Sequence, residues 1–207
     1  MRIIPFVAAA TAALSGVVGA QRSSDTFSLQ GRSAFSLGIG LTGARTETTA
    51  LGSVSEHTTG QVGSLAFTHW VRPTVAVEIS ASVLDADQTV SGAQVHDNAV
   101  VPILFGLSVS PRALALSQSI RPYVSLAAGP YVHAVSDVQG PATSSSTETA
   151  LGARFAVGAN WFVARHFLLG VDGNYHAVGK FDHPDALTRD PSAFGMSISF
   201  GFAWGGR

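Results

Sequence analysis

A small set of charged, amide and imidazole side chains lies inside otherwise apolar segments of the sequence. Glu78 and Arg154 are oppositely charged, and His176 could exchange a proton near neutral pH. Charges inside apolar segments persist mainly where they are paired. We therefore predict an internal polar network that satisfies its own hydrogen bonds. Its members are Glu78, Arg154, Asn160, Asp172, Asn174 and His176.

The histidines do not supply the arrangement that would activate a serine for acyl transfer. Neither His69 nor His176 has a serine two positions later, and Ser136 follows His133 at a different spacing. A serine nucleophile needs a histidine within hydrogen-bonding reach. We therefore predict that the protein is not an enzyme, and we assign no catalytic residue.

The sequence gives little support for a metal or a cofactor. Cysteine is absent, which excludes disulfides, thiolate ligands and a cysteine nucleophile. Asp182, His183, Asp185 and Asp190 could offer oxygen and imidazole ligands, but such residues among prolines are more typical of a solvated loop. We therefore predict no metal site and no cofactor.

The composition favours one ordered domain with few charges. Of 207 residues, 46% are hydrophobic and 12% are charged, and the net charge is −1. Lys180 is the only lysine, and the charges form no runs. Composition therefore predicts no basic surface for nucleic acid or for anionic lipid.

The N-terminus has the form of a secretory signal peptide. Arg2 precedes an apolar stretch over residues 3–18, and small residues follow before Gln21. A membrane anchor is the alternative, but the stretch is short for a span and Pro5 interrupts it. We predict that residues 1–20 are cleaved from the mature protein.

Beyond this segment, apolar residues recur at every second position, which is the period of a β-strand between two different environments. The opposite positions hold mainly Gly, Ser and Ala. This face has too few charged side chains for a surface exposed to water. Each segment covers about 9 to 11 residues, enough for a tilted strand to cross a bilayer. The segments are 33–42, 61–71, 74–84, 101–109, 124–132, 155–163, 167–176 and 194–204.

Segment 61–71 fits two phases, and hairpin parity favours one of them. Residues directly opposed in an antiparallel pair share a face. If Glu78 points inward, then Phe67 points outward when an odd number of residues forms the turn. Trp70 would then point inward at the mouth of a barrel.

In two other segments, Pro102 and Pro130 predict a β-bulge.

The links between segments alternate between short and long, except that 110–120 is intermediate, and this pattern predicts an all-β, transmembrane, antiparallel up-and-down barrel of about eight strands. Residues 21–32 would form a lead-in, 33–204 the barrel and 205–207 a C-terminal extension. The termini and short turns would lie at the periplasmic end. A girdle of aromatic side chains is expected there, formed by Trp161, Trp204, Tyr123 and Phe167. A soluble β-sandwich or barrel is the structural alternative.

The sequence resembles the small outer-membrane β-barrel family that includes OmpA-type and porin-like domains, over Phe27 to Trp204. The resemblance rests on RPYVSLAAGPYV, VPILFGLSV, LGARFAVGANWFVARHFLLGVDGNYH and FGMSISFGFAW. It implies export to the outer membrane of a Gram-negative cell. Outer-membrane lipid, lipopolysaccharide and the barrel-assembly machinery are the implied partners. Gly205 to Arg207 depart from the aromatic C-terminus usual in the family.

These patterns support location and fold more than a specific activity. We expect a structural or surface-interaction role with a lumen filled by side chains. A narrow passive channel and a lipid A-modifying enzyme are the two alternatives. The Ser- and Thr-rich links could contact an extracellular partner, which the sequence does not identify.

Overall fold

The computed structural model describes residues 28–45, 57–85, 88–90, 93–111, 117, 119–137, 145–179 and 192–206. These residues form nine strands in one sheet: β1 (Arg32–Arg45), β2 (His57–Arg72), β3 (Val75–Asp85), β4 (Gln88–Val90), β5 (Ala93–Val109), β6 (Ile120–Asp137), β7 (Ser145–Phe162), β8 (Phe167–Val178) and β9 (Ala193–Gly205). Among the described residues, no helix has the length and apolarity needed to span a membrane. The predicted signal peptide and the Asp182 to Asp190 cluster lie outside these residues.

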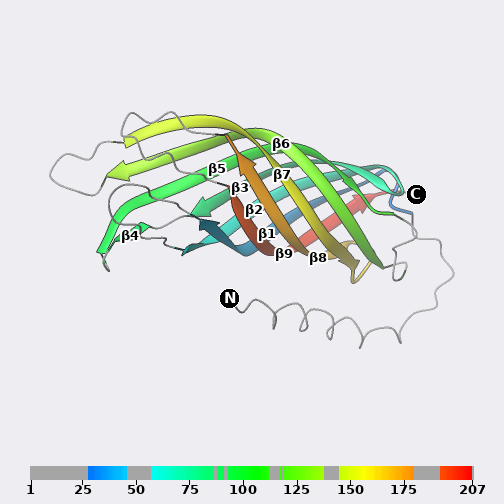
Figure 1. Cartoon of the computed structure of the whole chain (residues 1–207). Helices are drawn as coiled ribbons and strands as arrows, with labels where there is room; N and C mark the ends of the chain where they lie inside the picture. The colour runs from blue at the N-terminus through cyan, green and yellow to red at the C-terminus, as the bar shows by residue number, and fades with distance from the viewer. Residues whose placement is uncertain are drawn as a thin grey trace.

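Eight of the strands close into an antiparallel barrel, as predicted (Figure 1). The sheet order is β3-β2-β1-β9-β8-β7-β6-β5-β4, and an additional pairing of β3 with β5 joins the two sides. β4 has 3 residues and extends β5 as a small hairpin. β1 pairs with β9, so the first and last strands lie side by side. The predicted lead-in and extension each give one residue to this pair, because Arg32 is opposite Gly205.

The two faces of the barrel differ as the alternation predicts. On β9, Ile198 and Phe200 point outward with 54% and 60% of their surface exposed, whereas inward Ala203 is fully buried. The same outward series continues on β1 through Leu37 and Ile39. An apolar exterior suits contact with lipid, because lipid cannot solvate polar groups.

The phase expected for β2 is confirmed. Leu65 and Phe67 are exposed on the outside, and Trp70 is buried inside with 4% exposure. Trp70 pairs with Ala76, and the register shifts between Trp70 and Arg72. Val71 is therefore the extra residue of a bulge, and five residues lie between the paired positions, the odd number that parity requires.

The two ends of the barrel have different connections. One end carries the links 73–74, 110–119 and 163–166, and we call it the short-turn end. The strand ends at the other end, which we call the long-link end, are connected through residues 46–56, 86–92, 138–144 and 179–192.

Several strands are longer than the sequence predicts. β5, β6 and β7 have 17, 18 and 18 residues. Their pairing continues to Ser136 opposite Ser145, within a segment that the sequence assigned to a link. Apolar alternation marks the part of a strand that faces lipid, whereas backbone pairing can continue beyond it through polar residues.

The predicted bulge at the two prolines is wrong. Pro102 pairs with Tyr131, and Phe105 pairs with Ala128, so the register across this region is unchanged. The ladder is instead interrupted where Ile103 faces Pro130, because proline has no N–H group to donate. The missing N–H donor therefore interrupts the pairing of β5 with β6 here, but neither strand contains an extra residue.

Candidate functional site

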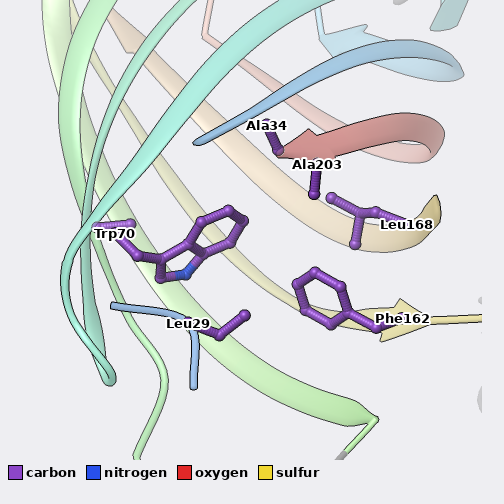
Figure 2. Close-up of a cluster of buried hydrophobic side chains, with 7 residues drawn as sticks. Leu29, Ala34, Trp70, Phe162, Leu168 and Ala203 are labelled. Atoms are coloured by element: carbon purple, nitrogen blue, oxygen red, sulfur yellow. The ribbon is translucent and has the colours of Figure 1, made fainter. Parts of the chain in front are cut away.

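The lumen at the short-turn end is closed by an apolar layer, shown in Figure 2. Leu29, which precedes β1, is 1% exposed and packs among side chains from several strands. The Trp70 and Phe162 rings meet edge to face with centroids 5.9 Å apart. The Gly31 amide donates to the Trp70 carbonyl oxygen over 2.8 Å, which fixes the chain beside Leu29. The layer consists of Leu29, Ala34, Trp70, Ala76, Phe162, Leu168 and Ala203.

A charged pair spans the lumen beyond this layer. Arg154 on β7 donates from Nη2 to Glu78 Oε1 on β3 over 2.6 Å. The side chains are 17% and 12% exposed, so both charges are largely removed from solvent. β3 and β7 are not sheet neighbours, and the pair therefore connects separate parts of the barrel wall.

A second carboxylate lies on the same inner face and accepts hydrogen bonds from neutral side chains. Asp172 Oδ1 accepts from Asn174 Nδ2 over 2.8 Å, and Asp172 Oδ2 accepts from Ser197 Oγ over 2.7 Å. The Tyr123 hydroxyl also makes a hydrogen bond to Asp172. Several donors to one carboxylate stabilise its charged form in a site with little water.

A third interior group lies toward the long-link end. His176 Nδ1 and Tyr131 Oη are 2.9 Å apart, and their rings meet edge to face. Tyr131 is fully buried and packs with Leu104 and Ala127 in a second apolar cluster. An apolar cluster therefore also lies on the long-link side of the polar groups.

Glycines make room for the two tyrosine rings. A Cβ at Gly152 would lie 2.6 Å from Tyr131 Cε2, and a Cβ at Gly158 would lie 2.9 Å from Tyr123 Cζ. Both contacts are shorter than any side chain tolerates without movement. The small residues that the sequence places on the inner face therefore leave space, and the two tyrosine rings occupy it.

The structure brings together most of the predicted network, and it corrects the predicted position of Tyr123. Glu78 contacts Arg154, while Asp172 contacts Asn174. Asn160 lies beside Gly170 on the inner face, nearer the short-turn end.

Tyr123 is not part of the outer girdle. It shares the inner face with Ser125, because its neighbour Val124 faces outward and adjacent residues of a strand alternate. The alternation along β6, in which Val124 faces outward, already predicts that Tyr123 points inward. The other three girdle residues, Trp161, Trp204 and Phe167, are exposed outside the barrel near the short-turn end.

Tyr123, Tyr131 and Ser197 are partners in the network that were not predicted from the sequence. Ser197 was recognisable as inward from the alternation of the last strand. Tyr131 was not, because an aromatic residue beside Pro130 gives no polar signal.

The described residues include one serine to histidine contact, with Ser33 Oγ 2.9 Å from His69 Nδ1. These side chains lie on the outer face beside Trp204. The carboxylate on the neighbouring strand, Glu78, points inward and pairs with Arg154, so it cannot orient His69. Within the described ranges, no group of three or more acidic or histidine residues has metal-binding geometry.

A closed eight-stranded antiparallel barrel with an apolar outside and a filled inside defines a transmembrane β-barrel protein. Residues 6–204 match the family model of the outer membrane protein beta-barrel domain, and the chain belongs to that family. It is accordingly an outer-membrane protein. No curated protein sequence matches the chain.

Solved structures share this fold at low sequence identity. Ail, the attachment invasion locus protein of Yersinia pestis, is 14% identical with a TM-score of 0.52, over 84% of this chain and 99% of that chain. Neisserial surface protein A is 16% identical with a TM-score of 0.54, over 82% and 97%. OprG from Pseudomonas aeruginosa is 15% identical with a TM-score of 0.54, over 86% and 97%. These similarities concern the fold.

Proposed function

We propose that this protein is a closed outer-membrane barrel with a structural or surface-interaction role, and that it is not a channel. The observation that carries the proposal is the Arg154 to Glu78 pair across the lumen. Eight strands enclose an interior that side chains can fill. The Trp70 layer lies on one side of the pair and the Tyr131 cluster on the other, and both place buried apolar side chains in the lumen.

Planar-bilayer recording of the purified barrel tests the closed lumen. We expect no steady, ion-selective current from the unmodified protein. A variant with Glu78→Ser and Arg154→Ser removes both bulky charges together, and we expect more frequent current steps from it. Steady conductance of the unmodified barrel would favour the passive channel and contradict the proposal.

A tall wall at the long-link end supports the surface-interaction part of the proposal. β5, β6 and β7 extend beyond β8 and β9 at that end (Figure 1). An 18-residue strand is roughly 60 Å long, and a tilt of about 45° leaves a height of roughly 40 Å. The apolar band of such barrels is about 25 Å tall, so part of this wall would stand outside the membrane.

The orientation is part of this proposal, with the short-turn end in the periplasm and residues 1–20 removed during export. The chain lacks cysteine, so single cysteines give unambiguous labelling. Ala164→Cys in a short turn should resist a membrane-impermeant maleimide on intact cells, and Ser53→Cys in a long link should react. The reverse pattern would invert the orientation. Intact mass of the membrane-extracted protein should correspond to a chain beginning near Gln21.

A further inference from the structure

The barrel separates its charges in a way that the composition does not suggest. Arg32, Arg72, Arg121 and Arg165 all lie at the short-turn end. The sequence segments that form this end, 28–36, 69–77, 106–126, 159–171 and 199–206, contain no Asp or Glu. Most acidic residues instead belong to the long links and the strand ends beside them. The expectation of no basic surface is therefore wrong for this end of the barrel.

Two of these arginines are available for a ligand. Arg72 and Arg165 are exposed, and neither forms an ion pair with another described residue. Arg32 is buried between them and donates from its guanidinium to the Arg165 carbonyl oxygen, which ties the β7 to β8 turn to β1. The position of the Arg165 turn is thus fixed by the fold.

An aromatic patch lies on the outer face toward the same end of the barrel. Phe67 and Phe202 flank Trp204, with ring centroids 6.1 and 6.3 Å from it. Phe167 lies 5.9 Å from Phe202, and the His166 ring stacks on Phe202 at 5.6 Å. The residues of the patch come from β2, β9, the start of β8 and the turn before it; Arg72 ends β2, and Arg165 precedes His166 in that turn. Aromatic side chains prefer the depth at which lipid chains meet headgroups.

We propose that Arg72 and Arg165 bind the headgroup phosphates of anionic phospholipids in the membrane leaflet at the short-turn end, with the acyl chains against the aromatic patch. This rests on the membrane-spanning role proposed above. Guanidinium groups match phosphate geometry with two parallel hydrogen bonds. A net positive rim favours phospholipids without a compensating ammonium group.

The spacing indicates separate phosphates for the two arginines. The Arg72 turn follows β2 and the Arg165 turn precedes β8, with β1 and β9 between these strands. Neighbouring strands are about 4.8 Å apart, so the two turns are roughly 15 Å apart along the rim. One phosphate cannot bridge this distance. Two single phospholipids, or one lipid with two phosphates, would fit.

Native mass spectrometry of the full barrel, extracted from nanodiscs of equal phosphatidylglycerol and phosphatidylcholine, tests the proposal. We expect phosphatidylglycerol to be enriched among retained lipids. One arginine near an anionic surface changes binding about fivefold, and each arginine holds its own phosphate, so Arg72→Gln with Arg165→Gln should lower the enrichment at each site about fivefold at low salt. Both residues are exposed, and the fold should not change.

Arg45→Gln, at the long-link end of β1, removes the same charge from the other rim and should leave the enrichment intact. Equal retention of both lipids by the unmodified barrel would overturn the proposal. So would an enrichment that survives in the double variant, or one that Arg45→Gln reduces equally. A barrel that conducts ions yet keeps the lipid preference would contradict the closed lumen and leave this site in place.

Discussion

Arg154 Nη2 lies 2.6 Å from Glu78 Oε1, although the two residues are 76 positions apart in the chain. The strands that carry them, β7 and β3, are separated by β6 and β5 on the shorter way around the barrel. The pair therefore depends on barrel closure. It also replaces water in the lumen, because each charge has its counterion within hydrogen-bonding distance.

Removing the cation alone should be costly. In Arg154→Ala, Glu78 remains in the lumen without its partner, and we expect the free energy of unfolding to fall by about 3 to 5 kcal/mol. Urea titration in lipid vesicles measures this change. The double variant Arg154→Met with Glu78→Gln leaves no unpaired charge and should recover most of the loss. Equal stability of single and double variants would show that the pair is not coupled.

The outward face should reject a charge near the middle of the membrane. Ile198 is 54% exposed and pairs with Ile39 and Val171, all on the apolar exterior. Ile198→Arg should destabilise folding into bilayers by about 2 to 4 kcal/mol if the site lies near the midplane. Ile198→Met keeps the apolar surface and is the matched control. An Arg variant as stable as the Met variant would contradict the assignment of this face to lipid.

Glycines on the two faces should differ in their tolerance of a methyl group. A Cβ at Gly152 would meet the buried Tyr131 ring, whereas a Cβ at Gly63 has no atom within 4 Å. We therefore expect Gly152→Ala to cost about 1 to 3 kcal/mol through overpacking and Gly63→Ala to have little effect. Unfolding midpoints in the same lipid compare the two. Similar losses at both positions would show that the lumen is looser than the structure indicates.

Alternation was enough to predict which side chains face outward, because each strand separates two solvents. Parity across one hairpin favours Phe67 outside and Trp70 inside if Glu78 points inward and the turn has an odd number of residues. The same parity places Tyr123 inside, yet its aromatic character and its position near a turn suggested the girdle. Residue type was therefore the weaker guide, and phase was the stronger one.

Contacts across the lumen could not be predicted from the sequence. Facing residues such as Arg154 and His176 follow from a short turn, but Arg154 and Glu78 meet through the closure of the whole sheet. The strand ends were also underestimated, since pairing of polar residues in β6 and β7 leaves no apolar signal. Likewise, the arginines at the short-turn end come from turns that are far apart in the sequence. A search for runs of charged residues therefore cannot detect them.

The last prediction concerns Leu29, which lies in the segment that the sequence assigned to a short N-terminal lead-in. Its side chain is 1% exposed and packs in the layer that includes Trp70 and Phe162. Leu29→Ala would leave a cavity in that layer and should lower the free energy of unfolding by about 2 to 5 kcal/mol. Gln30 is exposed next to it, so Gln30→Ala is the control and should change stability little. Trp70 is buried in the layer, and its fluorescence should shift toward the red in Leu29→Ala if water enters the cavity. Equal stability and equal fluorescence of the two variants would mean that the barrel is closed without Leu29.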